Sequence, residues 1–224
     1  MGLWLWSWQL NWRRKLEVGL GLEFQKSKNV PLVPCEQGRH KFGGKTRVSG
    51  AVPRSADTPI HHLLDLDLAD QLLPIRSEKV TRLPLLFPLW YGFGGPEIQY
   101  VVLGENEIDI VYLSDLSPDV PDDRNVQVAE FPEMMLRSSQ EFATEIGRQI
   151  NIGQDQIVAG EKPFCKNTKC RVFSKEEMKL VATIPPILIE GHPDIWWDFE
   201  GADMVFSFWN CQCCDSIYAE TCSC

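Results

Sequence analysis

The sequence predicts a mainly β protein, a β-rich α+β chain in which two similar β units arise from an internal duplication and pack as one body. Three observations lead to this prediction. Glycines and prolines interrupt residues 17–60 too often for a long helix. Apolar residues alternate with polar ones in several short runs, which is the period of a half-buried strand. A glycine turn followed by an alternating strand occurs once in each half of the chain.

The first half contains the clearest strand signals. Residues 64–68 alternate Leu with Asp, as a half-buried strand does. Residues 83–90 are apolar but contain two prolines, so we expect an irregular or edge segment there. Residues 98–112 alternate on both sides of a turn that begins at Gly104, which predicts a β-hairpin with one apolar face.

The second half is expected to mix strand with short helix. Residues 132–142 have a helix-compatible composition, with a proline suited to the first helical turn. Ser174 and Glu177 have the spacing of a capping box, which predicts one helical turn over residues 174–179. Residues 203–209 alternate apolar side chains with smaller ones and predict a strand that runs directly into a group of cysteines.

The repeated phrase sets the expected organisation. Its first copy runs from the turn at residues 40–44 to the strand at 64–68, and its second from the turn at 144–147 to the strand at 180–184. The Pro- and Asp-rich stretch between them is typical of a boundary. The expected parts are a Trp-rich N-terminal segment (1–37), a first β unit (38–116), a connector (117–130) and a second β unit with the cysteine cluster (131–224).

Charge and cysteine usage narrow the partners and the compartment. The net charge is −9 and the sequence pI about 5.0, which disfavours nucleic acid and favours a basic protein partner. Of eight cysteines, Cys35 stands alone and the others follow residue 164 in close groups. That distribution does not resemble a disulfide framework, so we expect reduced thiols and a cytoplasmic protein.

The grouped cysteines predict a structural zinc site. Zinc takes four thiolates at tetrahedral geometry, and two short Cys-x(n)-Cys loops supply them. Cys165 and Cys170 form the first pair. Cys211 and Cys214 are the simplest second pair, with Cys213 as a competitor for either place. Cys222 and Cys224 remain as spare ligands or free thiols.

No catalytic motif stands out, and the aromatic and acidic residues suggest two hypotheses for function. The chain lacks a Gly-x-Ser-x-Gly nucleophile turn. Aromatic residues beside acids are typical of protein interfaces. We therefore expect a protein-binding surface at Trp90, Tyr91, Trp196, Trp197, Asp198 and Glu200. The alternative is a hydrolase that uses the acidic and aromatic stretch 194–203.

The N-terminal segment suggests a third possibility. Tryptophans fall on alternate positions from Trp4 to Trp8 and recur at Trp12, just before a basic cluster. This pattern fits a covering strand, and it also fits an interfacial anchor through residues 1–15. The apolar stretch is too short to span a bilayer as a helix.

Several of these residues resemble a known family. The stretch from Lys41 to Gly44, the strand at 64–70, the turn at 146–147 and the two tryptophan stretches at 194–198 and 204–209 resemble YwqG-like bacterial proteins. The cysteine arrangement is similar to that of the programmed-cell-death-2 proteins, which act in ribosome assembly. The resemblance implies a duplicated β-rich fold without established catalytic residues, and its eukaryotic branch implies a chaperone for a basic ribosomal protein.

Together, these features predict a non-enzymatic protein-binding module. We expect it to be chaperone-like for a basic client, or to serve as an immunity-type partner. Enzyme activity at residues 194–203 and membrane attachment through residues 1–15 are the alternatives.

Overall fold

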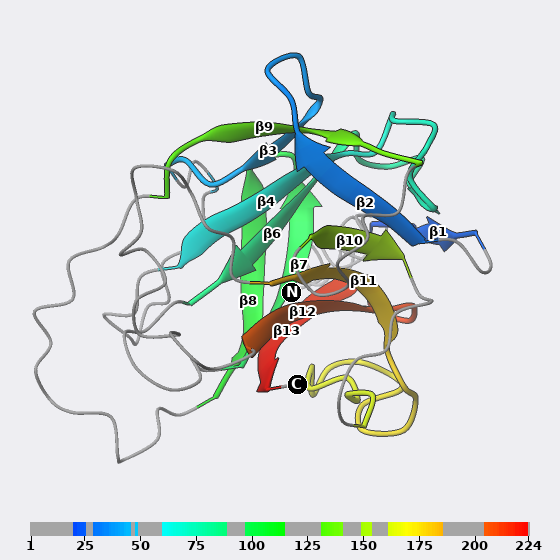
Figure 1. Cartoon of the computed structure of the whole chain (residues 1–224). Helices are drawn as coiled ribbons and strands as arrows, with labels where there is room; N and C mark the ends of the chain where they lie inside the picture. The colour runs from blue at the N-terminus through cyan, green and yellow to red at the C-terminus, as the bar shows by residue number, and fades with distance from the viewer. Residues whose placement is uncertain are drawn as a thin grey trace, which may run out of the picture.

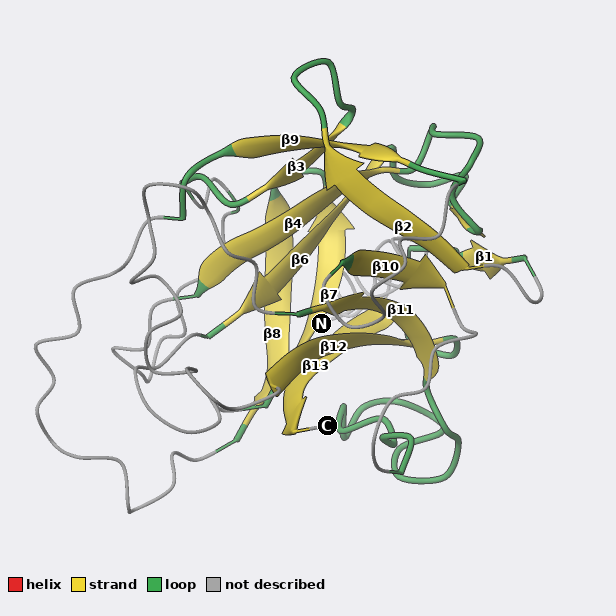
Figure 2. Cartoon of the chain, in the orientation of Figure 1, coloured by secondary structure: helices red, strands yellow, loops and turns green. Residues whose placement is uncertain are grey.

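The computed structural model describes residues 20–25, 29–45, 48, 60–88, 97–114, 131–140, 149–153, 161–185 and 204–223. Within these ranges the chain forms strands and turns, with no helix, which confirms the prediction of a mainly β protein (Figures 1 and 2). The strands are β1 (Glu23–Phe24), β2 (Asn29–Pro34), β3 (His40–Phe42), β4 (His61–Asp67), β5 (Ile75–Arg76), β6 (Arg82–Phe87), β7 (Ile98–Gly104), β8 (Glu107–Leu113), β9 (Met134–Ser138), β10 (Ile150–Gly153), β11 (Lys179–Ile184), β12 (Met204–Cys211) and β13 (Ser216–Ser223).

One antiparallel sheet of 11 strands dominates the structure, in the order β6-β4-β3-β9-β2-β10-β11-β12-β13-β7-β8. β1 and β5 form a separate two-stranded pair. The large sheet curls until its β6 edge lies against β7 (Figure 1). The buried Tyr100 hydroxyl on β7 holds this contact, since it donates to the Pro84 carbonyl and accepts from the Leu86 amide on β6, both at 3.0 Å.

The sheet buries apolar side chains on both faces near its C-terminal strands. Phe206 and Phe208 of β12 point into the main core inside the curl, together with Ile217 of β13. Because side chains alternate along a strand, Trp209 and Tyr218 point to the opposite face. There they join a second, smaller core that contains the clustered cysteines.

The two halves of the sheet pair in matching registers. At the centre, the antiparallel strands β2 and β9 pair around Val33 and Arg137. Leu32 faces Ser138 on one side of this pair, and Pro34 faces Leu136 on the other. Each of these strands then pairs with the second strand of the other half, β2 with β10 and β9 with β3. Both following strands carry a register shift at the same point, between His62 and Leu64 in β4 and between Leu180 and Ala182 in β11. An internal duplication would produce this correspondence, and the duplication itself stays a prediction.

A glycine with positive φ ends the corresponding strand in each half. Gly43, at φ +69°, follows β3, and Gly153, at φ +129°, closes β10. A Cβ on Gly43 would lie 2.5 Å from the Pro132 carbonyl oxygen, so only glycine fits there. The sequence pattern placed the second turn at Gly147, which lies outside the described residues, whereas Gly153 holds the matching position.

Two expected helical segments are wrong. Residues 134–138 form strand β9, because both edges of this segment are paired, one with β2 and the other with β3. Tertiary pairing therefore overrides the helix-compatible composition. Ser174 has φ +52°, which is incompatible with the extended backbone of a helix N-cap, and the segment forms turns instead.

The other expected elements are confirmed. The strand expected at 64–68 corresponds to β4, which begins earlier and ends at Asp67, and the hairpin is β7–β8. β6 is an edge strand with Pro84 inside it, and β12 runs into Cys211 as expected. No apolar helix of membrane-spanning length occurs in the part of the chain that the structure describes.

Candidate metal centre

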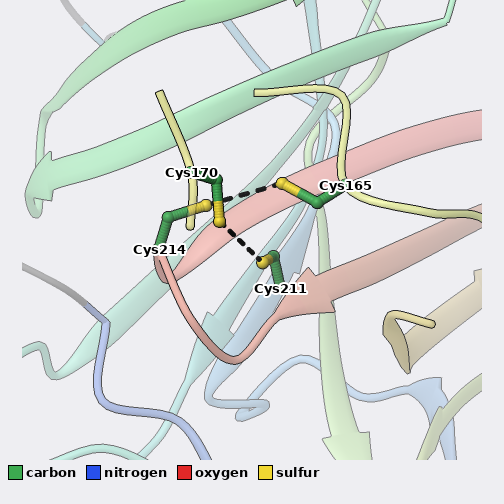
Figure 3. Close-up of side chains that lie close together, drawn as sticks. All are labelled: Cys165, Cys170, Cys211 and Cys214. Carbon is green, nitrogen blue, oxygen red and sulfur yellow. Dashed lines mark hydrogen bonds between the residues drawn. The ribbon is translucent and has the colours of Figure 1, made fainter. Parts of the chain in front are cut away.

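Four cysteine sulfurs converge on the outer face of the sheet. The Sγ atoms of Cys165, Cys170, Cys211 and Cys214 all lie within 4.8 Å of one another (Figure 3). Two of the separations are 3.7 Å, from Cys165 to Cys214, and 3.8 Å, from Cys170 to Cys211. Four sulfurs bound to one ion at about 2.3 Å in a tetrahedron lie about 3.8 Å apart. The spacing therefore suits a single tetrahedral metal ion, and these are the four cysteines that the sequence spacing predicts.

Two turns present the sulfurs from opposite sides. Cys211 ends β12 and Cys214 sits in the tight turn that leads into β13, closed by a 2.8 Å bond from the Asp215 amide to the Cys211 carbonyl. Cys165 and Cys170 belong to residues 161–178, which we call the cysteine knuckle. Figure 3 shows the knuckle sulfurs turned toward the β12–β13 turn.

The cysteine knuckle is folded by its own backbone hydrogen bonds. The Cys170 amide donates to the Asn167 carbonyl at 2.8 Å, and the Ser174 amide donates to the Cys165 carbonyl at 3.1 Å. The Asn167 side chain caps the intervening turn by accepting from the Lys169 amide at 3.0 Å. These bonds shape the four-residue loop between Cys165 and Cys170 so that both of these sulfurs face the same point.

Gln99 of β7 fastens the knuckle to the sheet. Its side chain is fully buried and accepts from the Lys166 amide at 2.7 Å. A backbone amide can only donate, so this bond fixes which end of the Gln99 side chain is oxygen. The opposite nitrogen donates to Cys165 Sγ at 3.2 Å and to the Ser216 hydroxyl. Ser216 Oγ lies 3.1 Å from Cys214 Sγ, so polar groups surround two of the four sulfurs.

The thiols differ in how readily they ionise. Hydrogen bonds from the Cys165 and Cys211 thiols hold the pKa of Cys214 far below its ordinary value. Burial raises the pKa of Cys170 to about 12. Hydrogen bonds with the side chains of Cys165 and Cys214 raise the pKa of Cys211 strongly as well. A divalent ion bound by these sulfurs would therefore displace the protons of Cys170 and Cys211.

Cys213 stands outside the cluster although it lies between two of its members. Its side chain is half-buried and packs against the smaller core, while its sulfur is not among the four that converge. Among the described residues, Cys211 and Cys214 therefore belong to the cluster and Cys213 does not. The sequence spacing alone did not distinguish these three cysteines. Cys224 lies outside the described residues.

A second polar cluster resembles a catalytic triad in composition only. The fully buried His40 lies 3.1 Å from the Asp70 carboxylate and 3.2 Å from the Ser138 hydroxyl through Nε2. Its Nδ1 accepts from the Asp67 amide at 3.1 Å, so Nε2 carries the proton and donates. Ser138 in turn donates to Asp70. The imidazole has no free acceptor for the serine proton, so this network joins β3 to β9 without activating a nucleophile.

The predicted interaction surface is not among the described residues. Trp90, Tyr91, Trp196, Trp197, Asp198 and Glu200 all lie outside them, and so do residues 1–15 and the hydrolase candidate at 194–203. Those hypotheses stay predictions.

The groups that support the sulfurs were not predicted from the sequence. Gln99 interrupts the apolar run Ile98–Val102. A buried polar side chain needs a hydrogen-bond partner, so this interruption was the sequence feature that could have indicated a role for Gln99. Ser216 follows Cys214 by two residues, on the same face of the chain.

Comparison with known proteins gives no match: neither a protein-family model, nor a curated protein, nor a solved structure is significantly similar to the chain. The resemblance to YwqG-like proteins stays a prediction.

Proposed function

We propose that this chain is a zinc-stapled β scaffold that binds another protein and has no catalytic activity of its own. The observation that supports the proposal is the group of four cysteine sulfurs within 4.8 Å of one another, with three of the side chains buried and that of Cys214 half-buried. A site of four thiolates suits zinc or iron, and sulfurs this close fit one ion better than a larger iron–sulfur cluster, which would spread them. Zinc is the common ion in such closed sites.

A site of this kind holds structure together and does not catalyse. Four protein ligands complete the tetrahedron, whereas catalytic zinc keeps one position for water or substrate. Hydrogen bonds to Cys165 and near Cys214 further reduce the reactivity of the sulfurs. Reduced thiols are required for binding, so the proposal includes a reducing compartment such as the cytoplasm.

The partner we propose is a basic protein, held as a client by a chaperone-like module or bound as an immunity-type partner. The net charge of −9 supports this choice, because an acidic surface raises the association rate of basic molecules and suppresses acidic ones. The predicted contact residues are the aromatic and acidic stretches around Trp90 and Trp196.

Binding of a labelled peptide rich in Lys and Arg tests the proposal. We expect the wild type to bind this peptide in low salt and to release it in high salt, because screened charges attract less. The variant Trp196→Ala/Trp197→Ala should bind more weakly with unchanged metal content and melting temperature. Equal binding of a neutral peptide of the same length would refute the basic-partner proposal.

A further inference from the structure

The cysteine knuckle exposes the large apolar side chains of this structure. Among the described residues, the large hydrophobic side chains that remain exposed are Phe164 and Phe173, each at 40%. Both belong to residues 161–178, which Figure 1 shows as a compact loop outside the strands. Single exposed apolar residues are ordinary, whereas two exposed phenylalanines in one short ordered segment are candidates for a contact surface.

The knuckle backbone holds both rings outward. Cys165, Val172 and Met178 fill the small core beneath the loop, and their neighbours in sequence point to solvent. Phe164 is fixed by a β-bridge to Glu177, and Phe173 by the bond from its amide to the Cys170 carbonyl at 3.1 Å. The rings are therefore presented by an ordered loop, which lowers the entropy lost when a partner binds.

The charge of the knuckle is opposite to that of the whole protein. Residues 161–178 contain five Lys or Arg and three Glu, a net charge of +2. Because the whole chain has a net charge of −9, the remaining residues carry −11. Lys162 is paired with Glu177 at 3.5 Å. The exposed side chains of Lys169, Arg171 and Lys175 form no ion pair within the described part of the chain.

We propose that Phe164, Phe173 and these three cations form a docking surface for an acidic peptide segment that carries apolar anchor residues. Apolar side chains of such a segment would cover the rings, and its carboxylates would meet Lys169, Arg171 and Lys175. This surface is distinct from the one proposed for a basic partner, and it depends on the proposed function only through the metal that would fix the knuckle to the β12–β13 turn.

A peptide suits this surface better than a nucleic acid. Aromatic rings and cations also bind single strands, but a polynucleotide carries its charge along its whole length. It would run from the small positive knuckle onto a body of charge −11, which repels phosphates. A short acidic segment ends before it meets that repulsion.

Fluorescence anisotropy on the full chain with its metal tests the proposal. The probes are a labelled peptide of Glu, Asp, Leu and Phe, the same peptide with Lys in place of its acids, and a labelled single-stranded oligonucleotide. We expect the acidic peptide to bind. Phe164→Ala/Phe173→Ala should weaken binding at least about 10-fold, as loss of anchor residues does. Arg171→Glu should weaken it similarly and reduce its salt dependence.

Matched variants separate the knuckle surface from the rest of the protein. Arg137→Glu, at an exposed position on β9, removes the same charge far along the sheet and should leave binding of the acidic peptide unchanged. Each variant should keep its metal content and melting temperature. The knuckle variants should not alter binding of the basic peptide, so failure of either proposal is recognised without the other. Unchanged affinity in the phenylalanine variant would overturn the inference, and so would preference for the oligonucleotide or self-association through these residues.

Discussion

Loss of one sulfur from the cluster should release both the metal and the cysteine knuckle. We consider Cys170→Ser, because Cys170 Sγ lies 3.8 Å from Cys211 Sγ and its side chain is buried. The hydroxyl of serine is a harder and weaker ligand for zinc than a thiolate. The matched control is Cys213→Ser, which changes a half-buried thiol one residue from the cluster without removing a ligand.

The expected magnitude follows from the number of ligands. Structural zinc contributes about 10–16 kcal/mol to folding in small metal domains. Four equivalent thiolates divide this, so one ligand accounts for about 2.5–4 kcal/mol. Cys170→Ser should therefore weaken metal affinity by about 10²- to 10³-fold, and Cys213→Ser should leave it within about twofold of wild type.

Competition with a chromogenic chelator measures the affinity, and limited trypsin digestion reports on the loop. Lys169 and Arg171 are exposed cleavage sites inside the knuckle, which its metal should hold in a resistant form. We expect cleavage there to be rapid in Cys170→Ser and slow in Cys213→Ser. Equal chelator competition by the two variants would contradict the assignment of the four ligands.

Three further predictions concern the scaffold. Tyr100→Phe should cost about 2–4 kcal/mol in urea unfolding, because it leaves a buried carbonyl and a buried amide on β6 without their partner; a loss below about 0.5 kcal/mol would show that β6 and β7 do not depend on this contact. Gly43→Ala should lower stability by more than the about 1–2 kcal/mol that positive φ costs, because its Cβ would also strike backbone, whereas Gly104→Ala meets nothing within 4 Å and serves as the control. Burial lowers the pKa of His62, whose ring nitrogens have no hydrogen-bond partner among the described residues, so the unfolded chain takes up the proton more readily and stability falls as pH drops below about 6.5. His62→Leu should therefore gain more stability over wild type at about pH 5.5 than at about pH 7.5, and an equal gain at both would refute this cause.

Local patterns predicted those elements whose cause lies within a few residues. The β7–β8 hairpin follows from alternation around a turn at Gly104, and β12 follows from the alternation of Phe206 and Phe208. The four cysteines that could hold a metal ion were predicted because a tetrahedral thiolate site requires a spacing that is visible in the sequence.

Features that depend on distant pairing were not predictable in this way. Residues 134–138 have a helix-compatible composition and become β9 only because β2 and β3 flank them on both sides. The role of Gln99 depends on contacts with Cys165 and Lys166, which lie far along the chain and share no pattern with it. Matching Gly43 with Gly153 likewise required the registers of the sheet.

Elemental analysis of the protein, purified under reducing conditions, tests the central claim most directly. The zinc-stapled scaffold predicts about one zinc ion per chain, bound by thiolates of the cysteine knuckle and the β12–β13 turn. Cys170→Ser purified in parallel should contain far less. A wild-type protein that holds no metal while its knuckle resists trypsin would contradict the claim, since the loop would then fold without an ion.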